Sequence, residues 1–336
     1  MNKTLTTALA ISALAVNVAG ATNTVGGTDN TISATSTSSA VWGFQNNIDA
    51  NNALAFGTNN TVTGENGFAG GNNATAAGRN SFAFGSHAES LVEYTVAIGN
   101  QARVSSYDSV AIGNGAFVSG ESSVALGRTN NVTGENSVAI GANNGTVAGG
   151  QSAVVGYNNK IGADKEQLVF GSNSESSGQG ALVFGTHAKA VAMDAVAFGN
   201  NTIADKPNAV VIGTNSVTDD AVGVDGITIN GTRHVFAGEQ PASVVSFGSK
   251  ARAGAGGVTQ YNRQLTNVSA GQISADSLDA INGSQLYAAI DEIETNAKQI
   301  SKNKQNIKDV AVGLNMLGDC SSITCDSLFM IVHYIA

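Results

Sequence analysis

The strongest constraint on the fold is a pentapeptide, Ser109-Val-Ala-Ile-Gly113, that recurs with variations along much of the chain. Successive copies close on a glycine, and these glycines are 14 residues apart except for two steps of 15 residues. The thirteen closing glycines are Gly43, Gly57, Gly71, Gly85, Gly99, Gly113, Gly127, Gly141, Gly156, Gly171, Gly185, Gly199 and Gly213. A near-constant period with one short apolar run per repeat predicts a solenoid, in which each repeat stacks on its neighbours.

Each repeat has the pattern of two short strands separated by turns. Large and small residues alternate, so Val110 and Ile112 lie on one face of an extended strand and Ala111 lies on the other. The closing glycine marks a sharp turn. A weaker run such as Asn131-Val-Thr133 follows, and it ends in a second turn signal, Gly134-Glu-Asn136. The repeat therefore predicts strand, turn, strand, turn, and the whole array predicts an all-β solenoid.

A circuit of 14 residues leaves little room inside a roll built from two strands. We therefore expect the alanine face to point inward and the large residues to point outward, although the sequence also permits the opposite facing. The large residues would then form a long apolar stripe, which a soluble monomer does not usually expose. The stripe predicts self-association, and its residues include Val96, Ile98, Val110, Ile112, Val124, Leu126, Val138 and Ile140.

Composition shifts along the chain indicate further segments. Residues 1–21 combine Lys3, a mostly apolar run and Ala19-Gly-Ala21, which is the pattern of a secretory signal peptide cleaved after Ala21. The segments expected after it are a leader (22–40), the head repeats (41–217), a connector with a hairpin and a last strand (218–260), a region with polar motifs (261–286), a heptad region (287–317) and an atypical tail (318–336).

The region 261–286 carries the second informative signature. Its residues of interest are Arg263, Gln264, Leu265, Thr266, Asn267, Asp279, Ala280, Ile281, Asn282, Gln285 and Leu286. Apolar residues then alternate at spacings of four and three, and isoleucine occupies both core positions of the heptad, which favours a three-stranded coiled coil. A simple amphipathic helix is the alternative. The expected seam consists of Ile290, Ile293, Ile300, Ile307 and Leu314.

The repeats, the Arg263-Gln-Leu-Thr-Asn267 segment with Asp279 to Leu286, and the heptads resemble a YadA-like trimeric autotransporter adhesin. The resemblance implies a head that is a left-handed parallel β-roll, a neck at residues 261–286 and a trimeric α-helical coiled-coil stalk. It implies no enzymatic activity and no cofactor. The family also has a C-terminal membrane anchor, and residues 318–336 are too short to supply one, so we expect the anchor to be missing from this sequence.

The resemblance also implies a function for the repeats. A homotrimer of this kind is expected at the bacterial cell surface or outer membrane, where its head binds a collagen-like matrix protein or a host cell receptor. The large residues of the repeats would be part of that binding surface. Two alternatives use the same repeats: a non-adhesive spacer or surface-coat protein, and a truncated adhesin that has lost its anchor.

The residue types argue against several other classes of protein. The formal net charge of −9 disfavours a nucleic-acid partner. His87 and His187 follow repeat glycines a hundred residues apart without further ligands at metal-binding spacing. Glu65, Glu121 and Glu135 recur at equivalent turns, which predicts a surface ladder and not an acid–base pair. The period and the absence of clustered carboxylates do not fit β-helical acyltransferases or lyases, so we expect neither a small-molecule substrate nor a metal.

Overall fold

The computed structural model describes residues 22–254 and 257–319. The expected signal peptide, with its cleavage after Ala21, and residues 320–336 of the expected tail lie outside the described residues. The described chain forms two compact units. The first comprises the residues up to Gly223 together with Gln240–Arg263, and the second comprises Val224–Glu239 together with the residues from Gln264 onward.

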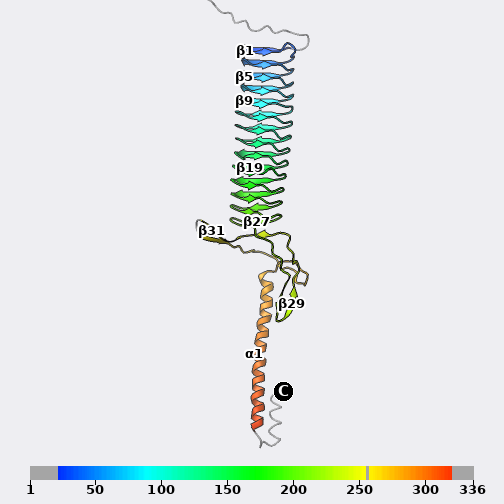
Figure 1. Cartoon of the computed structure of the whole chain (residues 1–336), viewed down its shortest axis with the longest axis vertical. Coiled ribbons are helices and arrows are strands. Elements are labelled where there is room, and N and C mark those ends of the chain that lie inside the picture. Colours follow the sequence, from blue (N-terminus) through cyan, green and yellow to red (C-terminus); the bar gives the residue numbers. More distant parts are fainter. Residues whose placement is uncertain (1–21, 255–256, 320–336) are drawn as a thin grey trace, which may run out of the picture. The chain divides into compact units, whose positions relative to one another are not determined.

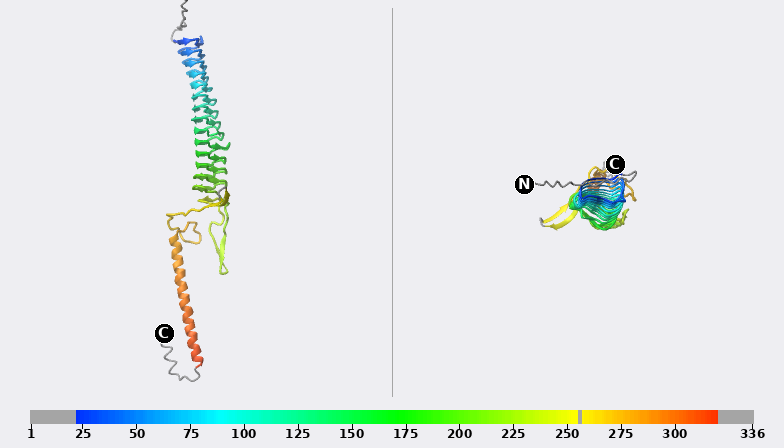
Figure 2. Two further views of the ribbon diagram at one scale, coloured as in Figure 1. Left: turned by 90° about the vertical axis from the view of Figure 1, so that its left-hand side faces the viewer. Right: turned by 90° about the horizontal axis from the view of Figure 1, so that it is seen from above.

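The first unit is a parallel β-solenoid of about 14 turns, stacked as Figure 1 shows. Seen from above, the coils lie over one another (Figure 2). Its main sheet, called the first sheet here, has 15 parallel strands. They are β1 (Thr24–Thr28), β3 (Ala40–Phe44), β5 (Leu54–Thr58), β7 (Phe68–Asn72), β9 (Phe82–Ser86), β11 (Val96–Ile98), β13 (Val110–Ile112), β15 (Val124–Leu126), β17 (Val138–Ala142), β19 (Ala153–Tyr157), β21 (Leu168–Ser172), β23 (Leu182–Thr186), β25 (Val196–Phe198), β27 (Val210–Ile212) and β30 (Val245–Ser246).

The second strand of every coil is only two residues long, which is shorter than the strand of about five residues expected from the repeat length. These strands form a nine-stranded and a four-stranded parallel sheet, together called the second face. The nine are β2 (Thr31–Ile32), β4 (Asn47–Ile48), β6 (Thr61–Val62), β8 (Thr75–Ala76), β10 (Glu89–Ser90), β12 (Arg103–Val104), β14 (Phe117–Val118), β16 (Asn131–Val132) and β18 (Thr146–Val147). The four are β20 (Lys160–Ile161), β22 (Glu175–Ser176), β24 (Lys189–Ala190) and β26 (Ile203–Ala204).

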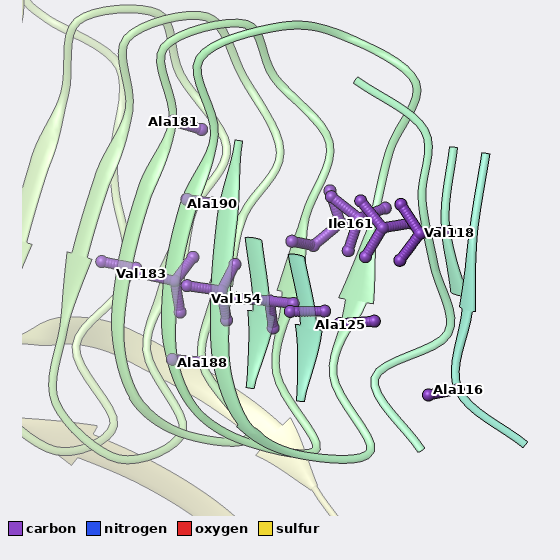
Figure 3. Close-up of a cluster of buried hydrophobic side chains, with 14 of the residues drawn as sticks. Ala116, Val118, Ala125, Val154, Ile161, Ala181, Val183, Ala188 and Ala190 are labelled. Atoms are coloured by element: carbon purple, nitrogen blue, oxygen red, sulfur yellow. The ribbon is translucent and has the colours of Figure 1, made fainter. Parts of the chain in front are cut away.

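The expected facing of the repeat is confirmed. Ala111 is fully buried, its neighbour Val110 is half-buried, and Ile112 is exposed. From the opposite strand of the coil, Val118 also points into the core and is fully buried. Figure 3 shows this interior, in which alanine, valine and isoleucine side chains from successive coils stack in rows. The small side chains let the two strands of a coil approach each other, so the core is narrow and continuous along the solenoid.

Two rows of buried polar side chains also line the interior. Asn60 Nδ2 donates to the carbonyls of Phe56 (2.9 Å) and Gly71 (3.0 Å), and Asn60 Oδ1 accepts the N–H of Ala74 at 2.9 Å. Ser123 Oγ accepts the N–H of the serine 14 residues later at 3.0 Å. These side chains satisfy backbone groups that the turns leave unpaired, because a buried unpaired amide is costly.

The closing glycines are required by the stacking of the coils. Gly113 has φ +139°, and a Cβ atom there would lie 2.1 Å from the carbonyl oxygen of Gly127 in the next coil. No other residue fits such a contact without moving the backbone. A positive φ is shared by all seven glycines that the sequence assigns to repeat turns: Gly57, Gly71, Gly85, Gly99, Gly113, Gly127 and Gly141.

The two longer coils interrupt the second face. The extra residue of the first is at the turn around Gly145, because Asn131 pairs with Thr146 and not with its predecessor. The extra residue of the second falls in the turn between Gly162 and Gln167. Strands β18 and β20 follow one another but share no hydrogen-bonded ladder. At this step the coils are joined mainly by the first sheet, where β19 and β21 pair over five residues.

Residues outside the clear repeats complete the first unit. Strands β1 and β2, within the expected leader, form a first coil in register with β3 and β4. At the other end β30 pairs in parallel with β27, although the residues between them leave the solenoid. A hairpin of β31 (Ser249–Gly254) and β32 (Gly257–Tyr261) follows.

The second unit contains a hairpin, a loop region and one helix. Strands β28 (Gly226–Ile229) and β29 (Thr232–Val235) pair antiparallel around an Asn-Gly turn. Helix α1 (Gly283–Asp319) begins after Asn282, whose Oδ1 accepts the N–H of Gln285 at 3.4 Å, while Gln285 Oε1 accepts the N–H of Asn282 at 3.1 Å. This reciprocal arrangement is a capping box, and it fixes the start of the helix.

Candidate functional site

The apolar stripe on the outer side of the first sheet is the most extensive candidate surface. In-register pairing aligns Val96, Val110, Val124 and Val138 in one row, and it aligns Ile98, Ile112, Leu126 and Ile140 in a second row. The first row is half-buried by its neighbours. In the second row Ile112 and Ile140 are each 38% exposed in the single chain. The structure therefore brings all eight predicted residues onto one face.

The apolar stripe extends beyond these residues in both directions. Aromatic rings replace the aliphatic side chains toward the two ends, and Phe56 is 58% exposed. Phe68 and Phe82 stack with ring centroids 4.6 Å apart, and Phe170 and Phe184 stack at 5.1 Å. The other exposed large residues on strands of the first sheet are Trp42, Phe44, Phe84, Tyr157, Phe170, Phe198, Ile212 and Val245. Nearly the full length of the solenoid thus carries an uncovered apolar surface on one side only.

The second face is polar and carries ion pairs between neighbouring coils. Arg103 lies 3.2 Å from Glu89, and Glu175 contacts both Lys160 (2.8 Å) and Lys189 (3.2 Å). The hydrogen bond from Lys160 is the main cause that lowers the pKa of the Glu175 carboxyl below its ordinary value. The solenoid is therefore amphipathic, with one apolar and one charged side.

The lowered pKa of Glu175 predicts a small acid-dependent loss of stability. A carboxyl with a depressed folded-state pKa stabilises the fold above its unfolded pKa, and this contribution disappears as the pH falls through the folded-state pKa. We expect at most about 1 kcal/mol, because the three side chains are partly exposed. Thermal unfolding of the native chain and of Glu175→Gln should therefore differ at neutral pH and converge in acid. A difference that persists in acid would exclude the ion pairs as its source.

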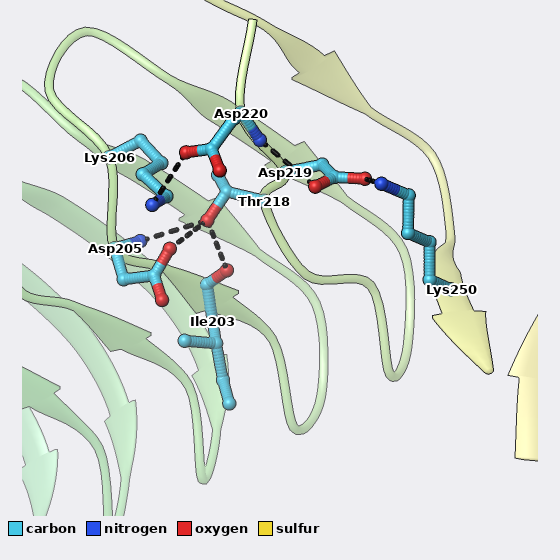
Figure 4. Close-up of polar contacts among 7 residues, drawn as sticks. All are labelled: Ile203, Asp205, Lys206, Thr218, Asp219, Asp220 and Lys250. Carbon is cyan, nitrogen blue, oxygen red and sulfur yellow. Dashed lines mark hydrogen bonds and ion pairs between the residues drawn. The ribbon is translucent and has the colours of Figure 1, made fainter. Parts of the chain in front are cut away.

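Ion pairs also close the C-terminal end of the solenoid, as Figure 4 shows. Lys206 Nζ lies 2.7 Å from an oxygen of Asp220, and Lys250 pairs with Asp219. Hydrogen bonding from Lys250 is the main cause that lowers the pKa of the Asp219 carboxyl. Thr218 Oγ1 accepts a backbone N–H of the preceding coil at 3.1 Å. These contacts hold the departing and returning segments against the last full coil.

The predicted neck residues divide between the two units. In the first unit, Arg263 Nη1 donates to Ser216 Oγ at 2.8 Å, and the guanidinium also binds the carbonyls of Phe247 and Thr214. Arg263 therefore caps carbonyl groups at the end of the solenoid. It also lines a hollow of about 380 Å³ with Tyr261 and residues of β30.

The remaining neck residues belong to the second unit. Gln285 Nε2 donates to the carbonyl of Gly271 at 2.7 Å, and Asp279 Oδ2 accepts the N–H of Gln272 at 3.0 Å. Asn267 has a positive φ of 62° at a turn. Gln264, Leu265, Thr266, Ala280, Ile281 and Leu286 are exposed. The polar residues fold the neck locally, and the apolar ones remain uncovered in the single chain.

The expected seam of α1 is uncovered as well. Ile290, Ile293, Ile300 and Ile307 are all exposed in the single chain. The position of the Leu314 side chain lies outside what the structure describes. Within the described residues, no group of three or more histidine, cysteine or carboxylate side chains is arranged to hold a metal ion. No helix there combines the length and the apolar character needed to cross a membrane.

One surface feature was missed from the sequence. A hollow of about 430 Å³ follows the corner between the second face and the first sheet, and it is lined by Ser106, Ser119, Gly120, Glu121, Thr133, Gly134, Glu135, Ala148, Gly150 and Lys165. We call it the corner trough. The recurrence of Glu121 and Glu135 was visible in the sequence, but the position of Lys165 depends on the extra residues of the longer coils.

Comparison with known proteins identifies the class of repeat and the family. A model described as "YadA head domain repeat (2 copies)" matches residues 49–74, 63–88, 93–116, 119–144, 176–202 and 190–216. A model described as "Coiled stalk of trimeric autotransporter adhesin" matches residues 264–309. Together the two models cover more than half of the chain, in the order head and then stalk. The chain belongs to the YadA-like trimeric autotransporter adhesins.

Individual relatives match smaller parts. The autotransporter adhesin BtaE of Brucella suis biovar 1 (strain 1330) is 42% identical over 84 residues, which is 25% of this chain and 10% of the relative. The chain thus spans about a tenth of the length of that curated relative. The C-terminal YadA-like domain of BPSL2063 from Burkholderia pseudomallei is 35% identical, with a TM-score of 0.28, over 38% of this chain and 50% of that one.

Proposed function

We propose that this chain contributes the head, neck and stalk of a homotrimeric adhesin at the bacterial cell surface. Its partner would be a collagen-like protein of the host extracellular matrix or a host cell receptor. The family and the name of the Brucella relative support an adhesive role and export to the cell surface. The proposed role is binding and not catalysis.

The apolar stripe is the observation that carries the homotrimer. It runs along nearly the whole solenoid on one side, and a monomer in water would leave it exposed. Three copies that face a common axis would bury the stripe, while their polar second faces would stay in water. Isoleucine at both core positions of the α1 heptads favours the same number of chains. A closed three-fold arrangement satisfies both segments at once.

Binding to immobilised matrix proteins tests the adhesive part of the proposal. The purified full chain should bind a surface coated with collagen and should saturate it, whereas a surface coated with serum albumin should bind little. Host cells provide the second surface, because a cell receptor is the alternative partner. A chain that is folded and trimeric but binds neither matrix proteins nor cells would support a spacer or coat protein instead.

A further inference from the structure

We propose that the corner trough binds an extended, neutral oligosaccharide. This inference rests on the proposed adhesive function, because it names one class of partner for the head. It concerns a surface separate from the apolar stripe and from the neck. The trough has a volume of about 430 Å³, which is within the usual range for ligand sites.

One wall of the corner trough is a row of side chains from successive coils. Backbone hydrogen bonds link Ser122 to Tyr107, Asn136 to Glu121, Gln151 to Glu135 and Glu166 to Gly150, so each acceptor occupies the same position in its coil. The row therefore reads Tyr107, Glu121, Glu135, Gly150, Lys165. Gly150 leaves a gap in this row. Across that gap the Lys165 ammonium and the Glu135 carboxylate are 3.8 Å apart.

The floor of the corner trough has no side chains. A Cβ atom at Gly120 would lie 2.0 Å from the carbonyl oxygen of Gly134, and one at Gly134 would lie 2.3 Å from that of Gly149. Stacking of the coils therefore excludes larger residues there. The hydroxyl groups of Ser119 and Thr133 line the other side. The result is a bare floor between a row of charged groups and a row of hydroxyls.

These groups suit the hydroxyls of a sugar chain. Carboxylates and side-chain hydroxyls accept or donate hydrogen bonds at each coil, and the coils repeat at the strand spacing of about 4.8 Å. That spacing is close to the length of one pyranose unit in an extended chain. The Tyr107 ring is 52% exposed at one end of the row and offers an apolar face on which a sugar ring can stack.

Charge selects a neutral ligand over a charged one. The trough carries two carboxylates and one ammonium, and the chain as a whole has a net charge of −9. A sulfated or carboxylated polysaccharide would meet repulsion. A basic peptide is less favoured, because the Glu135 carboxylate already faces an ammonium group. A neutral saccharide needs only the hydrogen-bonding groups and the aromatic ring.

Binding of the purified full chain to an array of neutral oligosaccharides of glucose, N-acetylglucosamine, galactose and mannose tests the proposal. Ala148→Trp would fill the trough with an indole ring, and Tyr107→Ala would remove the platform. We expect Ala148→Trp to weaken binding at least about tenfold. Ala77→Trp is the matched control, since Ala77 has the equivalent position in a coil outside the trough and its variant should bind normally. Thermal unfolding confirms that each variant is folded.

Three results would overturn the proposal: no neutral oligosaccharide bound, binding unchanged in Ala148→Trp, or salt-sensitive binding of a polylysine peptide in place of sugars. The test is separate from that of the adhesive function. If the Ala148→Trp chain and the native chain bind collagen-coated surfaces equally and neither binds sugars, the trough is not a glycan site and adhesion stands. If the native chain binds sugars but neither matrix nor cells, the trough stands and the proposed host partners fail.

Discussion

Replacing Val62 with aspartate should unfold the coils around it, whereas the same change at the adjacent Thr63 should leave them folded. Val62 is fully buried between the two strands of its coil, and Thr63 is exposed on the second face. A carboxylate at position 62 would be buried without a partner, so we expect a loss of at least about 4 kcal/mol. For Thr63→Asp we expect no more than about 0.5 kcal/mol.

Hydrogen exchange and thermal unfolding measure this difference. Because each coil contacts only its neighbours, the loss of protection in Val62→Asp should be greatest in the coils on either side and should fade toward the α1 end. Equal melting temperatures for the two variants would contradict the assignment of the interior. So would a loss of protection spread evenly over the chain.

Aspartate at both Ile112 and Ile140 should abolish self-association and leave the solenoid folded. Both side chains point outward on the apolar stripe and are already partly exposed in the single chain, so the coil interior is unchanged. In a trimer the two substitutions would place six carboxylates in a buried interface. We expect the affinity between chains to fall at least about 100-fold, which corresponds to about 2.7 kcal/mol.

The control for this experiment is Asn114→Asp, which adds a carboxylate at an exposed turn of the same coil as Ile112. It should associate like the native chain. Sedimentation velocity reports the species, and circular dichroism reports the fold. If the doubly substituted chain still associates, the stripe is not the interface. If it unfolds as a monomer, the outer residues contribute more to the coil than their exposure indicates.

Much of the solenoid follows from the sequence because its period is so regular. The spacing of the glycines predicts the stacking, and the alternation at Val110, Ala111 and Ile112 predicts which side chains are inside. Both predictions are confirmed, since a 14-residue coil has no room for large residues on both faces of its first strand. The apolar stripe follows directly from this facing.

Other features depend on contacts that a linear pattern does not reveal. The first coil lacks the apolar signature, because Gly26 replaces a large residue where the Trp42 indole of the next coil lies. The buried position of Asn60 contradicts the usual preference of asparagine for the surface, although the recurrence of asparagine at 14-residue intervals at Asn46 and Asn60 was available as a signal. In both cases packing between coils overrides the local pattern.

The corner trough could not be predicted for a similar reason. Glu121 and Glu135 were recognised as equivalent turn residues, which is how the structure places them. The gap at Gly150 and the ammonium of Lys165 become part of the same row only because two coils each carry one extra residue. A shift of one residue in either turn would move Lys165 out of line, and the sequence does not show where a turn absorbs its insertion.

The mass of the purified full chain in solution tests the central claim most directly. We expect multi-angle light scattering to give three chain masses across the micromolar range, because the apolar stripe and the isoleucine seam of α1 both require cover. A single chain mass at these concentrations, from a protein whose circular dichroism shows folded strands and helix, would contradict the claim that the outer face of the solenoid is an interface between copies.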